Sequence, residues 1–223
     1  MCRTRRASRH DAAPIGSCVK LLVEAQNVQT SAARLTFAPV SIRGPLQSGF
    51  PLVRRNRSAK KGQGTNLNLP VGIAVDGRGN VYVTNQGGAS IEEFAPSSSA
   101  PVRTVAGPAT GLDQPVAIAL DTAGNMYVAN QGSNSVTVYA AAAQGNVAPT
   151  RIIAGASTAI SYPEGLALDA AGNVWVTNLH GGEPGAVTVF ARGASGDVAP
   201  MATYTASNST YAFNPSGIAI VAP

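Results

Sequence analysis

A sixteen-residue phrase occurs three times in this 223-residue chain, and it constrains the fold more than any other feature. The copies read PVGIAVDGRGNVYVTN from Pro70, PVAIALDTAGNMYVAN from Pro115 and PEGLALDAAGNVWVTN from Pro163. A shorter fourth copy, PSGIAIVAP, begins at Pro215, so the spacings are 45, 48 and 52 residues. Repeats of this length are typical of architectures in which each repeat forms one supersecondary unit that packs against its neighbours.

Each unit predicts four short strands. In the first unit they are GIAVD, NVYVTN, SIEEFA and PVRTVAG. Between the first two strands, the pattern Asp-x-x-Gly-Asn predicts a tight hairpin, in which Asp accepts backbone amide hydrogens and Gly takes a positive φ. The apolar runs do not alternate with polar residues, which is typical of a sheet covered on both faces. Four strands in a period of about 40–50 residues indicate the blades of a β-propeller.

The phrase resembles the core P-x-G-I-A-V-D-x-x-G-N-V-Y-V-x-N/D of the bacterial NHL-repeat propellers. The resemblance covers residues 62–223, about three quarters of the chain. It implies an all-β fold with about three four-stranded blades plus one extra strand, an incomplete ring, and an irregular N-terminal arm. Because that family includes enzymes, sensor domains and interaction platforms, the resemblance implies a fold and not one activity.

The charge divides the chain into two parts. Residues 1–61 hold 12 of the 16 Lys and Arg residues and two acids, whereas residues 62–223 hold four basic and nine acidic residues. We therefore predict a basic arm of low order over 1–61 and NHL-like blades over 62–223, with units near 62–106, 107–154 and 155–206 and a final strand in 207–223. The arginines of the arm lack interleaved aromatic residues, which argues against a nucleic-acid partner. Both cysteines, Cys2 and Cys18, lie in the arm, so the repeats require no disulfide.

The location of the protein is predicted from the resemblance. No stretch reaches the roughly 18–20 apolar residues of a transmembrane helix. The polar residues upstream of Cys18 do not form the apolar segment of a signal peptide. Relatives with this repeat resemble exported bacterial surface proteins, so we expect an extracellular or cell-surface location.

Three units and one strand provide fewer blades than the roughly 4–8 of known propellers. Three arrangements remain open. Residues 37–45, which read FAPVSIRGP and echo SAPVRTVAGP, could add strands; two chains could self-associate to complete one propeller; or the sequence is a fragment of a longer six-bladed protein. The repeat pattern stops at residues 57–61, RSAKK, and this abrupt end favours a fragment.

The candidate ligand-binding residues lie where the third unit departs from the others. In a propeller of four-stranded blades, two kinds of loop lie on the same face. One joins the fourth strand of a blade to the first strand of the next blade, and the other joins the second and third strands of one blade. The second-to-third loop of unit three, NLHGGEPGA, is longer than its counterparts and holds His180 and Glu183. Glu164 follows Pro163, where the other units carry Val, Val and Ser. A His and a Glu could form a general base with its partner or two metal ligands, although a solvated loop tip is the commoner role.

The sequence contains no motif of a known catalytic class, and we assign no catalytic residue. Gly-x-Ser-x-Gly, a phosphate-binding loop and Cys-x-x-Cys are all missing from the chain. We therefore predict a non-catalytic binding or structural module without a cofactor, with a protein or glycan as ligand. The residues that recur in every unit are interpreted as structural: Asp76, Asp121, Asp169, Asn85, Asn130 and Asn178.

The alternative is a metal-dependent propeller hydrolase or lyase of the gluconolactonase or streptogramin-lyase type. Such an enzyme would hold a divalent metal near Glu164, His180 and Glu183. Streptogramin lyases resemble this repeat but use more than one histidine, whereas the repeats here contain His180 alone. The metal ligands of the gluconolactonases have no residue-by-residue match in this chain.

Overall fold

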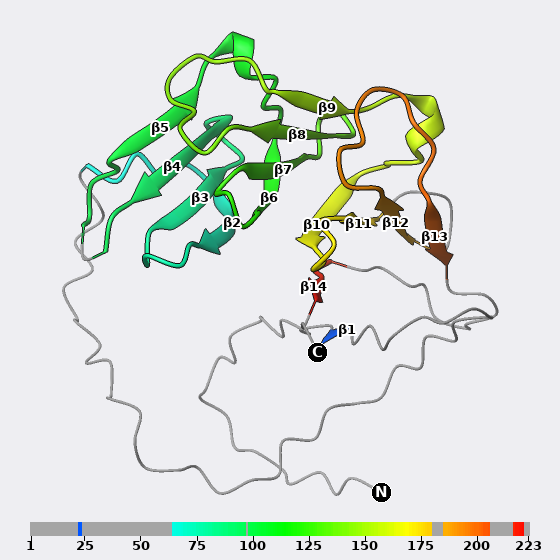
Figure 1. Cartoon of the computed structure of the whole chain (residues 1–223). Helices are drawn as coiled ribbons and strands as arrows, with labels where there is room; N and C mark the ends of the chain where they lie inside the picture. The colour runs from blue at the N-terminus through cyan, green and yellow to red at the C-terminus, as the bar shows by residue number, and fades with distance from the viewer. Residues whose placement is uncertain (1–21, 24–63, 97, 180–184, 206–215, 221–223) are drawn as a thin grey trace, which may run out of the picture.

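The structure is a computed structural model that describes residues 22–23, 64–96, 98–179, 185–205 and 216–220. It contains three four-stranded antiparallel sheets, and each sheet is built from four consecutive strands in chain order (Figure 1). We call these sheets blades 1, 2 and 3. They confirm the prediction of an all-β fold with three four-stranded blades and one extra strand.

The strand bounds follow the repeats. Blade 1 contains β2 (Pro70–Val75), β3 (Val81–Asn85), β4 (Ser90–Phe94) and β5 (Arg103–Ala106). Blade 2 contains β6 (Pro115–Leu120), β7 (Met126–Asn130), β8 (Ser135–Tyr139) and β9 (Arg151–Ile153). Blade 3 contains β10 (Pro163–Leu168), β11 (Val174–Asn178), β12 (Ala186–Phe190) and β13 (Ala202–Thr205).

Short elements connect and extend the blades. The 3-10 helices η1 (Pro108–Thr110) and η2 (Ala156–Thr158) lead from blade 1 to blade 2 and from blade 2 to blade 3. The extra strand β14 (Ala219–Ile220) pairs in parallel with β1 (Leu22–Val23). The division at residue 61 stays a prediction because residues 24–63, which include the segment 37–45, lie outside the described residues.

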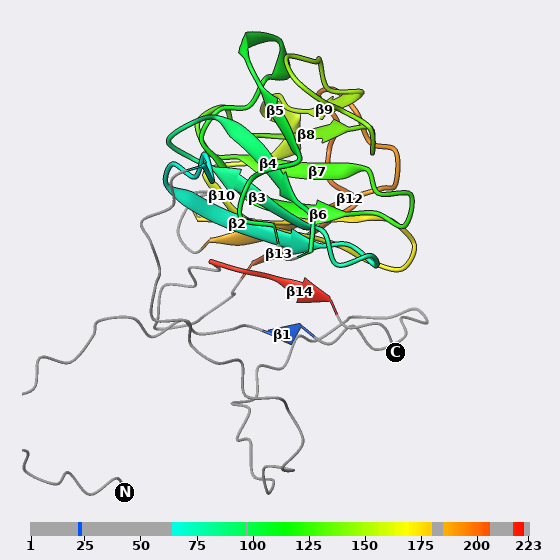
Figure 2. The same cartoon turned by 90° about the vertical axis from the view of Figure 1, so that its left-hand side faces the viewer.

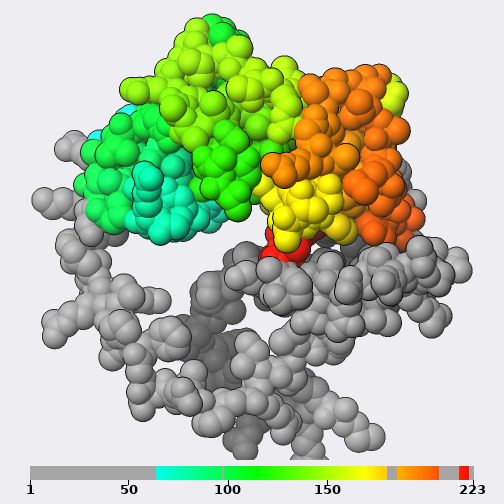
Figure 3. Space-filling view, in the orientation of Figure 1, coloured from blue at the N-terminus to red at the C-terminus, as the bar shows by residue number. Residues whose placement is uncertain are grey.

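The first strand of each blade lies at the inner side of the arrangement. β2 lies beside β6, β6 beside β10 and β10 beside β14, whereas β5, β9 and β13 form the outer edges (Figure 1). The sheets pack face to face (Figure 2), and the blades follow one another as contiguous blocks in chain order (Figure 3). This is the packing of propeller blades, with β14 in the place of the first strand of a fourth blade.

The core is divided between the two blade interfaces, which explains why the strands are apolar throughout. Met126 and Val128 of β7 point into the cluster between blades 1 and 2. Tyr127 and Ala129 of the same strand point into the cluster between blades 2 and 3. All four side chains are at most 4% exposed. Because successive residues of a strand point to opposite faces, a strand that is covered on both sides needs an unbroken apolar run.

The predicted Asp/Gly-Asn hairpin is confirmed in every blade. In blade 3, Asp169 Oδ1 accepts a hydrogen bond from the Asn173 amide at 2.8 Å, and Oδ2 accepts one from Trp175 Nε1 at 3.1 Å. Gly172 has a φ of 83°, which an L side chain rarely adopts. Burial raises the pKa of Asp169, but the hydrogen bonds from Trp175, Asn173 and the Ala171 amide outweigh it, so the pKa lies below its ordinary value.

We expect the protein to lose stability in acid partly through the turn that contains Asp169. The folded-state pKa of Asp169 lies below the unfolded-state value of about 3.9. The ionised carboxylate therefore makes its full contribution to the free energy of unfolding above the unfolded-state pKa. The contribution is lost as the pH falls through the folded-state pKa. Urea unfolding from about pH 5 to about pH 2.5 should show a smaller loss of unfolding free energy for Asp169→Asn than for the wild type. Equal losses in the two proteins would contradict this assignment.

Candidate functional site

The fourth-to-first and second-to-third connections meet on one face of the structure, as the sequence predicts. A backbone hydrogen bond of 3.0–3.1 Å joins the two connections in every blade. These bonds run from Gln86 N to Leu69 O, from Gln131 N to Gln114 O and from Leu179 N to Tyr162 O. The three loops are therefore held in equivalent positions, and side chains at matching repeat positions lie next to one another.

The buried asparagine at the end of each second strand holds these connections in place. Asn130 is fully buried, and its Oδ1 accepts a hydrogen bond from the Asp113 amide at 3.2 Å. Its Nδ2 donates to Ser135 Oγ at 3.4 Å and to Thr137 Oγ1 at 3.0 Å. Asn85 and Asn178 make equivalent bonds in blades 1 and 3. The interpretation of this series as structural is confirmed.

Three polar side chains form a hydrogen-bonded row across the blades on this face. Gln86 Nε2 donates to Gln131 Oε1 at 3.3 Å, and Gln131 Nε2 donates to Glu164 Oε1 at 2.7 Å. Gln86 and Glu164 are half-buried, whereas Gln131 is 7% exposed. We call these residues the Gln–Glu row. It is the feature of the described residues that links all three blades through side-chain chemistry.

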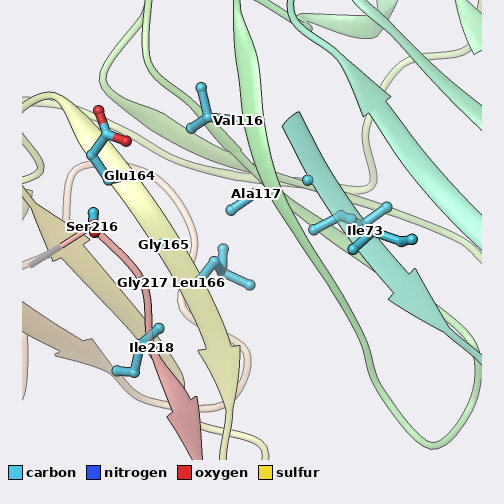
Figure 4. Close-up of a pocket in the computed structure, with 11 residues that line it drawn as sticks. Ile73, Val116, Ala117, Glu164, Gly165, Leu166, Ser216, Gly217 and Ile218 are labelled. Atoms are coloured by element: carbon cyan, nitrogen blue, oxygen red, sulfur yellow. The ribbon is translucent and has the colours of Figure 1, made fainter. Parts of the chain in front are cut away.

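Glu164, the last residue of the Gln–Glu row, lines an open hollow of about 180 Å³ over the inner strands. Residues of all three blades and of the segment before β14 line the hollow, among them Gly72, Ala117, Glu164, Gly165, Ser216 and Gly217. Glu164 and Val116 lie toward one end of the hollow, and Ile218 lies toward the other (Figure 4). Large apolar residues such as Ile73, Leu166 and Ile218 share the lining with these small residues, so a ligand in the hollow would meet apolar side chains, backbone atoms and the carboxylate of Glu164.

The small residues are required because the inner strands approach one another closely. Gly72 N donates a hydrogen bond to Thr84 Oγ1 at 2.9 Å across a bulge between β2 and β3. A Cβ on Gly72 would lie 2.6 Å from that oxygen and 2.8 Å from the carbonyl oxygen of Val116 in blade 2. In the second unit Ala129 replaces this threonine, and Ala117 occupies the glycine position. A glycine on the first strand therefore occurs with a threonine on the second strand in unit one, and an alanine occurs with an alanine in unit two.

Blade 1 also contains a buried acid that the sequence analysis did not single out. Glu92 of β4 is 2% exposed and accepts hydrogen bonds from Ser90 Oγ and Thr104 Oγ1. Its neighbour Glu93 forms an ion pair with Arg103. The matching residues in the other blades are threonines, and this departure from the repeat is the signal that could have identified Glu92.

The predicted site residues are only partly placed by the structure. Glu164 lies on the shared face and lines the hollow. His180 and Glu183 lie outside the described residues, so their proximity to Glu164 stays a prediction. Among the residues that the structure describes, no three His, Cys, Asp or Glu side chains are grouped as metal ligands would be. In this part of the chain no helix has the length and apolar character needed to cross a membrane.

Neither glutamine of the row was singled out from the sequence. The signal was present, because Asn-Gln ends the second strand in units one and two, whereas unit three has Asn-Leu. The repeat pattern did not reveal that Glu164 takes the place of a third glutamine by approaching from the start of β10.

No protein-family model and no curated protein sequence matches this chain. Among solved structures, the chain is similar to hydrazine synthase of Kuenenia stuttgartiensis, with 21% identity and a TM-score of 0.52 over 70% of this chain and 40% of that chain. A catalytically inactive virginiamycin B lyase from Staphylococcus aureus with quinupristin matches at 17% identity and a TM-score of 0.47, over 66% and 44%. A nidogen/laminin complex matches at 18% identity and a TM-score of 0.45, over 55% and 44%.

These similarities concern the fold. The chain spans less than half of each of these relatives, and every identity is below a quarter. The match to hydrazine synthase supports the propeller-like packing of the three blades. Since one fold supports both enzymes and binding proteins, the activity depends on the residues of the site and not on the fold.

Proposed function

We propose that this chain is a non-catalytic binding module of NHL type that acts outside the cell and holds a protein or glycan ligand on the face of the Gln–Glu row. The observation that carries the proposal is the row itself, which runs over three blades and ends at Glu164, in the lining of the hollow. Its glutamines are anchored by neighbouring side chains and by the backbone bonds of their loops.

The chemistry of the row supports a hydrogen-bonding ligand. A glutamine amide both donates and accepts, and an ionised glutamate accepts only. Sugar hydroxyls and peptide groups also combine donors with acceptors, so either can match such a row. Because the row is held in place before a ligand arrives, little conformational entropy is lost when the ligand binds.

The proposal is tested with the full chain on an array of glycans and an array of short peptides. We expect a retained ligand whose affinity falls at least tenfold in Gln131→Leu, because that change breaks both hydrogen bonds of the row and leaves a polar ligand group unpaired. The matched control is Gln144→Leu, at an exposed position of the connection between β8 and β9. No retained ligand on either array, or equal affinity in the two variants, would contradict the proposal.

A metal-dependent hydrolase or lyase is the second candidate, and the carboxylate of Glu164 beside the hollow favours it. Thermal unfolding of the full chain with Ca²⁺, Mg²⁺ or Zn²⁺ distinguishes the two functions. A metal-dependent rise in the unfolding temperature that is lost in both Glu164→Gln and His180→Ala would support the second candidate. No metal-dependent rise would remove it.

A further inference from the structure

The inner strands follow a regular alternation of large and small side chains. On each of them, two large apolar residues point toward the preceding blade: Ile118 and Leu120 in blade 2, and Leu166 and Leu168 in blade 3. The residues that alternate with them are small and point toward the following blade, such as Ala117 and Ala119 in blade 2. At the inner strands, the small side of each blade therefore receives the large side of the next blade.

Blade 1 presents a large side that no described blade covers. Ile73 is 67% exposed and Val75 is 60% exposed, whereas the matching Ile118 and Leu166 are 6% and 7% exposed. Val81 and Val83 of β3 on the same side are half-buried, and their counterparts in blades 2 and 3 are at most 1% exposed. Figure 2 looks onto this sheet, with β2 to β5 in front. We call these four residues the open face of blade 1.

The segment that ends in β14 presents the complementary small side. A Cβ on Gly72 would lie 2.8 Å from the carbonyl oxygen of Val116 on the next inner strand. A Cβ on Gly165 would lie 3.0 Å from Gly217 Cα. A Cβ on Gly217 would meet no described atom within 4 Å. Among the described residues, the series of inner strands therefore begins with an uncovered large side and ends with an uncovered small side.

We propose that two copies of this chain associate head to tail, with the open face of blade 1 in one copy packed against the Gly217–Ala219 side of the other. The repeat indicates that a second copy covers the open face, since both covered blade interfaces show the same large side packed on the same type of small side. A contact of this kind that is made twice around a two-fold axis closes into a ring. This inference is independent of the ligand proposed above.

Exposed apolar surface supports the same contact. Contiguous apolar patches are uncommon on monomeric proteins and mark interaction sites when they occur. Leu67 and Leu69, which lead into β2, are also 42% and 65% exposed. A sheet face built like the interior of the blade stack is most stable when another blade covers it.

The test is the molar mass of the full chain in solution, measured by sedimentation and by light scattering. We expect a dimer for the wild type. Ile73→Lys should weaken dimerisation at least tenfold, because it places a charge in an apolar contact. Met201→Lys is the matched control, since Met201 is 63% exposed on blade 3 and lies away from the open face; it should remain dimeric.

A second variant tests the other half of the contact. Gly217→Val should also weaken dimerisation, because its side chain would fill the small side, while Gly77→Val in an exposed turn should not. A wild type that is monomeric throughout the micromolar range would overturn the proposal and leave the open face to a further blade of a longer polypeptide. A dimer that persists in both Ile73→Lys and Gly217→Val would overturn it as well.

Discussion

Gly72→Val should lower the free energy of unfolding by about 3 kcal/mol, at the upper end of what overpacking usually costs. The Cβ alone would lie 2.6 Å from Thr84 Oγ1, 2.8 Å from Val116 O and 2.9 Å from Ala117 Cα. Two of these atoms belong to the backbone of blade 2, so a side-chain rotation cannot relieve the contact. The inner strands of blades 1 and 2 must separate, and the apolar cluster between the blades is disturbed. Urea unfolding followed by circular dichroism measures the loss.

Two further variants identify the cause. Gly77→Val should be nearly neutral, because a Cβ on Gly77 meets no described atom within 4 Å and its φ is not positive. Combining Gly72→Ala with Thr84→Ala should recover part of the stability that Gly72→Ala alone loses, since it removes the contact with the hydroxyl but not those with the backbone. If Gly72→Val were as stable as Gly77→Val, the close approach of the inner strands would be disproved.

Asn130→Leu should cost a similar amount, about 3 kcal/mol, for a different reason. Leucine has nearly the same volume but leaves the Asp113 amide and the hydroxyls of Ser135 and Thr137 without their partner. Each buried polar group left unsatisfied costs roughly 1–3 kcal/mol, and the hydroxyls can rotate to recover part of this. The change should also loosen the connection that carries Gln131.

Two measurements separate these effects. The unfolding free energy of Asn130→Leu is compared with that of Gln144→Leu, an exposed polar-to-leucine change that should be within about 0.5 kcal/mol of the wild type. Hydrogen exchange of the Gln131 amide, which donates to Gln114 O, should become faster in Asn130→Leu. An unchanged unfolding midpoint would show that the buried asparagine is dispensable.

The strands and turns were predictable because they depend on local sequence. Asp169, Gly172 and Asn173 lie within five residues of one another, and the hydrogen bonds of their turn join atoms of that same segment. The apolar runs were equally informative, since a strand that faces two blades must be apolar on both sides. The structural role of Asn130 also followed from its recurrence in every unit.

The candidate site was only partly predictable. Glu164 was identified because it departs from the repeat, yet its partner Gln131 is 33 residues away, and Gln131 is in turn 45 residues from Gln86. Such contacts depend on how far each blade is displaced and rotated from the next. A repeat pattern does not contain that displacement, because the recurring residues describe the inside of each blade and not its position relative to the next blade.

The sequence by itself determined the blades of this protein: four strands in each unit, an Asp/Gly-Asn turn between the first two strands, and a buried asparagine at the end of the second strand. These features result from the hydrogen-bonding and conformational preferences of neighbouring residues. The tertiary structure alone decided which residues of different blades meet. The close approach of the inner strands at Gly72 and Gly165, the Gln–Glu row, and the uncovered Ile73 and Val75 all arise from the packing of one sheet on another, which acts between residues far apart in the chain.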